Sequence, residues 1–207
     1  MDGTLLESMH IWENVGRDFL LAHSMQPEPD LRERLRAKSL RQSAVYYREH
    51  YGADMPEDAI MAEINGMLEE QYFHVVQPKP GAEALLVRLQ ERGVRMCVAT
   101  STARYLTEAA LRRCGLTRYI GEIFTCEEVG AGKDSPEIFM RALDWLGGEK
   151  EHTPVFEDAY FAMLTAKTAG FPVVAVYDKS AEAQNEKIRA IADIYLQNYG
   201  EAEKYGI

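Results

Sequence analysis

The sequence predicts an α/β fold, a Rossmann-like parallel sheet core that carries an inserted block of helices. Two observations support this prediction. From residue 80 onward, short apolar runs alternate with amphipathic helical segments over short connections, which favours a parallel sheet covered by helices on both faces. Before residue 80, apolar residues recur at helical spacing and no stretch alternates as a half-buried strand does.

The helical block comes first along the chain. Leu31 and Leu35 share a helix face, and a longer amphipathic helix is indicated by apolar residues three and four positions apart: Ile60, Met61, Ile64, Met67 and Leu68. We therefore expect a helical cap over residues 13–78 and a core formed by residues 1–12 and 79–207.

The core elements follow in order. Apolar runs predict strands at 94–99, 123–125, 154–156 and 173–176, and helical patterns lie between and after them at 103–114, 135–146, 160–169 and 181–190. Pro80 and Gly81 open a further helix, which Gly93 ends. An Asp-Gly-Thr turn in such a sheet belongs at the carboxyl end of a strand. We therefore expect a strand before Asp2, outside residues 1–207.

Composition narrows the classes of partner and compartment. The chain has 207 residues and a formal net charge of −10, which argues against nucleic acid or an anionic membrane as partner. An anionic substrate would need a local positive feature. The three cysteines are odd in number and lack CxxC spacing, so we do not expect a zinc site or a disulfide framework. We expect a cytoplasmic protein. We expect a monomer or weak dimer.

Polar residues follow the expected strands at several places: Asp2-Gly3-Thr4, Thr100-Ser101-Thr102, Gly132-Lys133 and Glu157-Asp158. Each has an ordinary structural explanation when taken alone, as a turn, a helix cap, a loop or a solvated pair. The carboxyl ends of parallel strands meet at one edge of a sheet. The set therefore predicts a shared site at that edge.

These segments, in this order, resemble the haloacid dehalogenase superfamily of phosphatases, in the β-phosphoglucomutase and phosphoglycolate phosphatase group with a helical cap. Asp2-Gly3-Thr4-Leu5 matches the second half of the first motif, and Val98-Ala99-Thr100-Ser101 matches the second. Gly132-Lys133 and Val155-Phe156-Glu157-Asp158 match the third and fourth. The family's strand order implies a vacant or distorted slot between the strands at 94–99 and 154–156, where the first, central strand would lie.

The resemblance also implies a mechanism. A carboxylate nucleophile attacks a phosphate monoester and forms an aspartyl phosphate that water hydrolyses. Asp2 would be the general acid and base, while Thr100, Ser101 and Lys133 would bind the phosphoryl group. Glu157, Asp158 and the carbonyl of Asp2 would hold Mg²⁺. The family's nucleophile stands two residues before Asp2, outside residues 1–207, so we expect the chain as written to be inactive and poorly stable.

The expected function is Mg²⁺-dependent hydrolysis of a small phosphorylated metabolite. A non-catalytic binding module on the same scaffold and a sugar-phosphate mutase stay open as alternatives. The mutases carry a hinge histidine where this chain has Trp12, and His10 is two residues away, which favours the phosphatase. A phosphoacceptor signalling domain ranks lower, because such domains lack a helical insertion of this size. No motif between residues 13 and 77 identifies the substrate.

Overall fold

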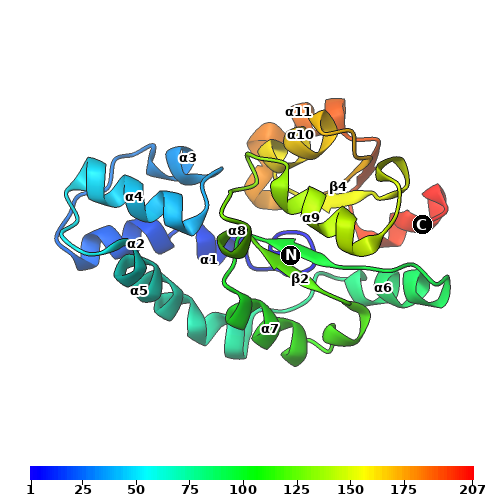
Figure 1. Cartoon of the computed structure of the whole chain (residues 1–207), viewed down its shortest axis with the longest axis horizontal. Coiled ribbons are helices and arrows are strands. Elements are labelled where there is room, and N and C mark those ends of the chain that lie inside the picture. The colour runs from blue at the N-terminus through cyan, green and yellow to red at the C-terminus, as the bar shows by residue number, and fades with distance from the viewer.

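The computed structural model describes residues 1–207, the whole chain. Helices gather at one end of the molecule and the strands with their flanking helices at the other (Figure 1). The N-terminus lies in the middle, between the strands (Figure 1). The predicted α/β architecture with parallel strands is confirmed. None of the helices combines the length and the apolar character that crossing a membrane requires.

The first eighty residues form helices, as predicted. They are α1 (Met9–Trp12), α2 (Val15–Ala22), α3 (Leu31–Leu35), α4 (Leu40–Tyr51), α5 (Glu57–Glu70) and the π-helix η1 (Gln71–Val75). We call α2 to α5 the helical lobe. Ser39 and Gln42 form a capping box at the start of α4, which satisfies free backbone N–H groups there. Of the predicted face of α5, Met67 is an exception, since it is 38% exposed while the other members are buried.

Helices and strands alternate in the rest of the chain. The helices are α6 (Ala82–Glu91), α7 (Arg104–Arg113), α8 (Cys126–Val129), α9 (Glu137–Leu146), α10 (Tyr160–Thr168) and α11 (Asn185–Ile191), and the strands are β1 (Val98–Thr100), β2 (Ile123–Thr125), β3 (Val155–Glu157), β4 (Val173–Val176) and β5 (Ile194–Leu196). Short 3₁₀ helices complete the set at Thr117–Tyr119, Lys150–His152, Lys179–Gln184 and Tyr199–Tyr205 (η2 to η5). In Figure 1, α9 to α11 lie on one side of the strands, and α6 and α7 lie on the other.

Three details differ from the sequence prediction. The helix expected over residues 181–190 is the 3₁₀ helix η4 followed by the shorter α11. The strand expected over residues 94–99 starts only at Val98, because its partner β2 is three residues long and pairs only with Val98, Ala99 and Thr100. The strand β5 was not predicted, and it pairs in parallel with β4. Its three residues are too few to show a periodic pattern.

The strands form two separate sheets. One holds β1 and β2, and the other holds β3, β4 and β5 in that order, all in parallel. The strands β1 and β3 are therefore not paired with each other. The slot between them and the strand before Asp2 both stay predictions.

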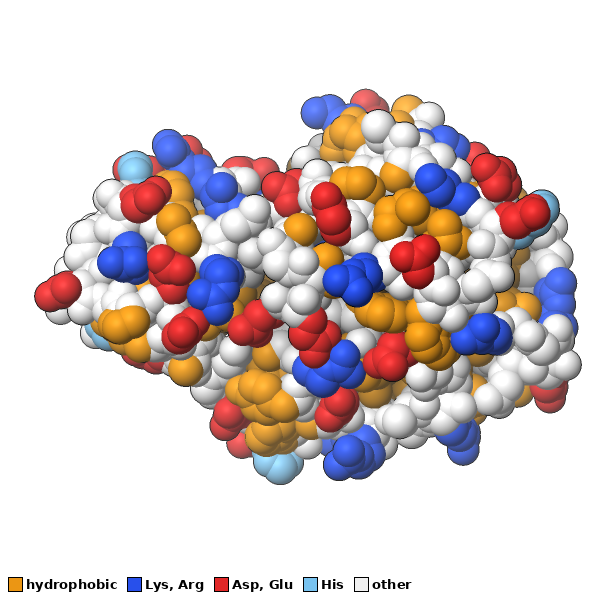
Figure 2. Space-filling model, in the orientation of Figure 1, with side chains coloured by type: hydrophobic (Ala, Val, Ile, Leu, Met, Phe, Trp, Pro, Cys, Tyr) orange, Lys and Arg blue, Asp and Glu red, His pale blue; other side chains and the backbone are white.

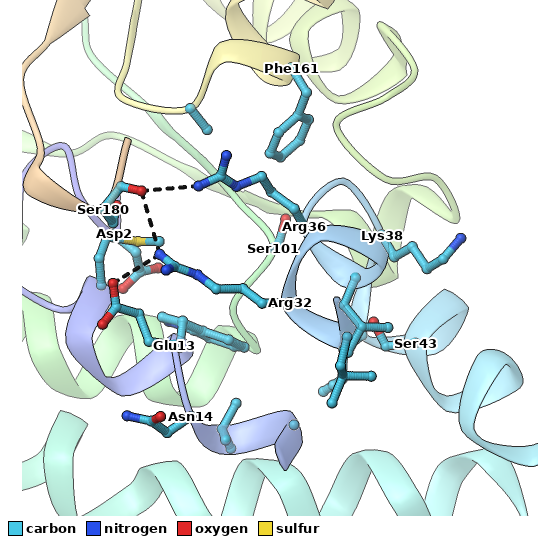
Figure 3. A pocket seen from close by; sticks show the side chains of 18 of the residues that line it. Asp2, Glu13, Asn14, Arg32, Arg36, Lys38, Ser43, Ser101, Phe161 and Ser180 are labelled. Carbon is cyan, nitrogen blue, oxygen red and sulfur yellow. Dashed lines mark hydrogen bonds and ion pairs between the residues drawn. The ribbon is translucent and has the colours of Figure 1, made fainter. Parts of the chain in front are cut away.

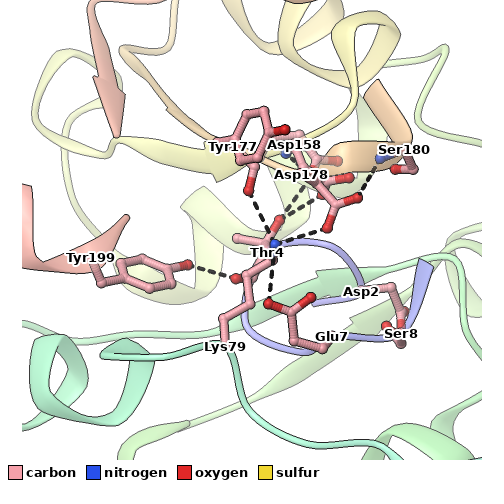
Figure 4. Close-up of polar contacts among 11 residues, drawn as sticks. Asp2, Thr4, Glu7, Ser8, Lys79, Asp158, Tyr177, Asp178, Ser180 and Tyr199 are labelled. Atoms are coloured by element: carbon pink, nitrogen blue, oxygen red, sulfur yellow. Dashed lines mark hydrogen bonds and ion pairs between the residues drawn. The ribbon is translucent and has the colours of Figure 1, made fainter. Parts of the chain in front are cut away.

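The turn of residues 1–8 links distant parts of the chain. The N–H groups of Thr4, Leu5 and Leu6 all donate to the carbonyl of Met1, at 3.2, 2.7 and 3.1 Å. The N–H of Lys79 donates to the carbonyl of Leu5 at 2.8 Å, and the Tyr199 hydroxyl donates to the carbonyl of Thr4 at 2.7 Å (Figure 4). The turn is thus hydrogen-bonded both to Lys79, which follows the helical lobe, and to Tyr199 in the C-terminal η5.

One apolar core runs from the helical lobe into the strand region. Phe19 of α2, Leu68 of α5 and Leu106 of α7 are fully buried members of the same cluster. A second cluster lies around α9, α10 and β4, and a third joins α6 to β4, β5 and η5. On the face drawn in Figure 2, basic and acidic side chains are interspersed, and no single-sign basic patch is visible.

Gly3 permits the first turn to approach the end of β3. Its φ is +65°, and a Cβ at this position would overlap the carboxyl group of Asp158 and meet Cγ of Met9 at 2.8 Å. An L side chain in this backbone conformation costs about 1 to 2 kcal/mol, and overpacking adds about 1 to 3 kcal/mol.

We expect Gly3→Ala to destabilise the protein by about 2 to 5 kcal/mol, the sum of these two costs. Gly115→Ala is the matched control, since Gly115 has a φ of +71° but open space around a Cβ, and should cost only about 1 to 2 kcal/mol. Urea unfolding of the two variants measures the difference. Equal losses would show that the turn can move away from Asp158.

A buried ion pair joins the start of the core to the segment after β4. Nζ of Lys79 lies 2.8 Å from Oδ2 of Asp178 and donates to the carbonyl of Tyr177 at 3.1 Å (Figure 4). Both side chains are less than a tenth exposed. Burial alone would raise the pKa of Asp178, but hydrogen bonds from Lys79 and Ser180 outweigh it and hold that pKa below its usual value.

We expect Lys79→Met to destabilise the protein by about 3 kcal/mol at pH 7, because it leaves the buried Asp178 carboxylate without its cation. Lys204→Met is the control, since it breaks a pair whose lysine is 67% exposed and should cost less than about 1 kcal/mol. Urea unfolding across pH checks both values. The depressed pKa of Asp178 gives stability above the unfolded pKa of about 3.9, so the Lys79→Met deficit should shrink as pH falls through the lower folded value. A deficit that is constant down to pH about 3 would contradict this assignment.

Candidate functional site

A cavity of about 480 Å³ lies between the helical lobe and the strand ends. Every residue expected at the site lines it: Asp2, Thr100, Ser101, Lys133, Glu157 and Asp158. The opposite wall comes largely from the helical lobe and includes Arg32, Arg36 and Ser43 (Figure 3). The structure therefore brings together four sequence segments that were separate along the chain.

The charged end of the cavity is buried. Nζ of Lys133 lies 2.8 Å from Oε1 of Glu157. The hydroxyl of Thr4 donates to Oδ1 of Asp158 at 2.8 Å and lies 3.3 Å from Oε2 of Glu157. Glu157 and Asp158 are each 3% exposed. The first turn is thereby tied by a side chain to the carboxylates that follow β3.

The two adjacent carboxylates have opposite electrostatic surroundings. Burial would raise the pKa of Glu157, but the charge and hydrogen bond of Lys133 outweigh it and lower that pKa. Burial and the charge of Glu157 together raise the pKa of Asp158 well above its usual value. Lys133 stays charged, because Glu157 outweighs the effect of burial and raises its pKa. Two adjacent buried carboxyl groups therefore differ in how readily each gives up its proton.

Adjacent buried carboxyl groups beside a cavity can supply oxygen ligands to a cation. No group of three or more His, Cys, Asp or Glu side chains is placed to hold a metal ion by itself. Glu157 and Asp158 supply carboxylate oxygens, and Asp2 lines the same cavity. Mg²⁺ in phosphoryl-transfer sites is usually held by one or two carboxylates together with waters and substrate phosphate. The donors present fit Mg²⁺ on these chemical grounds.

Three hydroxyl groups surround the carboxylate of Asp2. Ser8 and Tyr72 donate to Oδ1 at 2.6 and 2.5 Å, and Thr102 donates to Oδ2 at 2.7 Å. Burial raises the pKa of Tyr72 well above its usual value, with the charge of Asp2 acting in the same direction, so the phenol keeps its proton. Both carboxylate oxygens of Asp2 are engaged in this structure.

The second segment contributes differently at each position. Thr100 is 1% exposed, and its hydroxyl accepts from the N–H of Thr102 at 3.1 Å. Ser101 is exposed to the cavity, and its Oγ lies 3.4 Å from Sγ of Cys126. Thr102 belongs to the segment predicted to lie at the site but had no role predicted for it, and it makes the contact with Asp2.

Sequence reasoning missed the polar neighbours of the predicted residues. Ser8 and Thr102 lie close in sequence to motif residues. Apart from that closeness, only their hydroxyl groups indicated that they could hydrogen-bond to a site residue. Tyr72 is 70 positions from Asp2, and its place on η1 gave no sign of which way the ring points. In α4, Tyr47 lines the cavity, whereas its neighbours Tyr46 and Arg48 do not.

Two arginines of the helical lobe reach across the cavity. Arg36 donates to the carbonyl of Ser180 at 3.0 Å, and Arg32 donates to the same oxygen at 3.4 Å (Figure 3). Arg32 also pairs with Glu13 at 2.9 Å. These contacts join α3 and its C-cap residue, Arg36, to the segment after β4.

Comparison with known proteins places this geometry in a family. The chain is 26% identical over 186 residues to protein CbbY of Rhodobacter capsulatus, covering 84% of this chain and 81% of that protein. It is 29% identical over 179 residues to hexitol phosphatase A of Escherichia coli strain K12, covering 85% and 80%. The crystal structure of CbbY from Rhodobacter sphaeroides in complex with phosphate shares the fold, with a TM-score of 0.84 at 22% identity over 97% of this chain and 92% of that one.

The model of the haloacid dehalogenase-like hydrolase family matches residues 1–176, which include all the predicted site residues. The predicted resemblance is confirmed: this chain belongs to the haloacid dehalogenase-like hydrolases.

Proposed function

We propose that this protein hydrolyses the phosphate monoester of a small metabolite with the help of Mg²⁺. The observation that carries the proposal is the buried cluster of Lys133, Glu157 and Asp158, which lines one cavity together with Asp2 and Thr100. Phosphoryl transfer depends mainly on positioning and on compensation of the phosphate charge. A buried lysine, two carboxylates suited to Mg²⁺ and a separate carboxylate for protons meet those needs.

Each residue has a distinct role in this proposal. The Lys133 ammonium and the Thr100 and Ser101 segment bind the phosphoryl oxygens. Asp2 gives a proton to the leaving oxygen as the ester P–O bond breaks, and takes a proton from the water that later cleaves the aspartyl phosphate. Glu157, Asp158 and the carbonyl of Asp2 would hold Mg²⁺, which supplies positive charge to the phosphate when bound.

The carboxylate that attacks phosphorus is proposed to stand two residues before Asp2, a position outside residues 1–207. The carboxylates within the chain already have other partners. Glu157 is paired with Lys133, Asp158 accepts from Thr4, and Asp2 accepts from three hydroxyls. The proposal therefore assigns these three groups to metal binding and proton transfer, not to attack on phosphorus.

The cavity supports a small substrate. Its volume of about 480 Å³ lies within the range of about 300 to 1,000 Å³ that is usual for small-molecule sites. We propose that residues 13–78 act as a cap that closes this space over the core formed by residues 1–12 and 79–207. The relative named hexitol phosphatase A supports a phosphorylated sugar or polyol as the substrate class.

The central test compares two forms of the protein. One is the chain as written, and the other is extended upstream by an apolar strand that ends in aspartate two residues before Asp2. We expect Mg²⁺-dependent hydrolysis of p-nitrophenyl phosphate only by the extended form, and loss of this activity on chelation of the metal. The extended form should also melt at a higher temperature, because a central strand buries apolar side chains worth roughly 1.5 to 3 kcal/mol each. Equal turnover by both forms would show that the nucleophile lies within residues 1–207.

Lys133→Met in the extended form should lower kcat/KM by about 100-fold or more, since it removes a charge aimed at the phosphoryl group. Lys79→Met is a matched control, because Lys79 is also buried and ion-paired but does not line the cavity. Kinetics are compared at a temperature where both variants are folded, as judged by circular dichroism. A similar loss in both variants would point to general destabilisation and count against the role of Lys133.

A further inference from the structure

The two segments that connect the helical lobe to the core meet at Asp2. Trp12 ends α1, just before the lobe, and Tyr72 lies in η1, just after it. Nε1 of Trp12 donates to the Tyr72 hydroxyl at 2.7 Å, and that hydroxyl donates to Oδ1 of Asp2 at 2.5 Å. Tyr72 is fully buried. A continuous chain of hydrogen bonds therefore runs from both connections to the proposed acid and base.

The direction of this chain is fixed by the donors and acceptors present. An indole N–H can only donate, so the Tyr72 oxygen accepts from Trp12. The single phenolic proton is then directed at the carboxylate of Asp2, which accepts it. Trp12 thus orients the Tyr72 hydroxyl, and the hydroxyl in turn orients Asp2.

The remaining donors on Asp2 come from the core side. Ser8 is the second donor on Oδ1, and Thr102 is the donor on Oδ2. Ser8 precedes α1, and Thr102 follows β1. Of the three residues that donate to this carboxylate, Tyr72 is therefore the one that lies in the segment after the helical lobe.

We propose that Tyr72 is a positioning residue for Asp2. Its hydroxyl, held by Trp12, fixes the orientation in which the Asp2 carboxylate gives and takes protons. Acid and base chemistry at Asp2 then depends on how Gln71–Val75 sits against the core. This inference rests on the proposed function, because it assumes that Asp2 transfers protons to and from the substrate.

The need for a correctly placed acid differs between substrates. The p-nitrophenolate ion is weakly basic and can leave without a proton, whereas an alkoxide is strongly basic and needs one. A misplaced Asp2 should therefore slow cleavage of an alkyl phosphate far more than cleavage of p-nitrophenyl phosphate. Loss of folded protein would slow both by the same factor.

The test uses the upstream-extended form and two esters of similar shape, benzyl phosphate and p-nitrophenyl phosphate. The measured quantity is kcat/KM, which reports the steps up to departure of the leaving group. We expect Tyr72→Phe to lower kcat/KM for benzyl phosphate by about tenfold or more and for p-nitrophenyl phosphate by less than about threefold. Trp12→Phe should give the same ester-dependent pattern, with a smaller loss.

Tyr119→Phe is the matched control. Tyr119 is also a buried tyrosine with its hydroxyl on a carboxylate, at 3.2 Å from Glu83, but it does not line the cavity. This variant should affect both esters equally and slightly. A Tyr72→Phe variant that loses the same factor on both esters, or nothing on either, overturns the proposal.

A crystal structure of the Tyr72→Phe variant tests the positioning role of Tyr72 independently of any activity measurement. We expect the Asp2 carboxylate to turn away from its contacts with Ser8 and Thr102. A carboxylate that keeps both contacts in the same torsions would overturn the positioning role. If the unsubstituted extended form hydrolyses neither ester, the proposed function fails by itself, and this crystal structure still decides the inference.

Discussion

The buried charges around Thr4 hold the two halves of the core in register. The sheets β1–β2 and β3–β4–β5 share no ladder hydrogen bonds, so other groups must fix their relation. The first turn supplies one such link, since the Thr4 hydroxyl donates to Asp158 after β3 and the Asp2 carboxylate accepts from Thr102 after β1. Lys133 supplies another through Glu157. Burying charges in this way is a poor source of stability, so the cluster is better explained by chemistry than by folding.

The continuous apolar core limits how freely the helical lobe can move. Phe19 and Leu68 of the lobe belong to the same buried cluster as Leu106 of α7 and Leu6 of the first turn. Separating the lobe from the core would expose part of that cluster to water, at about 25 cal/mol per Å² of apolar surface. The Trp12 to Tyr72 hydrogen bond lies between the lobe and the core. A small shift of η1 would therefore change the orientation of the Asp2 carboxylate at a lower free-energy cost than a large separation of the lobe from the core.

The parts that the sequence predicted well are those set by topology. Lys133, Glu157 and Asp158 could be placed at one edge because parallel strands send their carboxyl ends to the same side, and this does not require knowing any side-chain direction. The contacts of Ser8, Tyr72 and Thr102 with Asp2 depend on rotamers and on the exact path of η1, which no periodicity encodes. The late start of β1 has a similar origin. Residues 94–97 are followed by a strand, but whether they pair depends on the length of β2, far along the chain.

Arg36, at the C-terminal end of α3, places a positive charge on one wall of the cavity. The chain carries a formal net charge of −10, which by itself repels an anion in solution. Arg36 donates its hydrogen bond to the neutral carbonyl of Ser180. The acidic side chain paired with it is the exposed Glu33, at 3.9 Å, so its positive charge is only weakly compensated. An approaching phosphate ester therefore meets the Arg36 guanidinium in a cavity that acidic side chains also line. Attraction of this kind raises the association rate and is screened by salt, which makes the speed of substrate capture, more than its final affinity, sensitive to ionic strength.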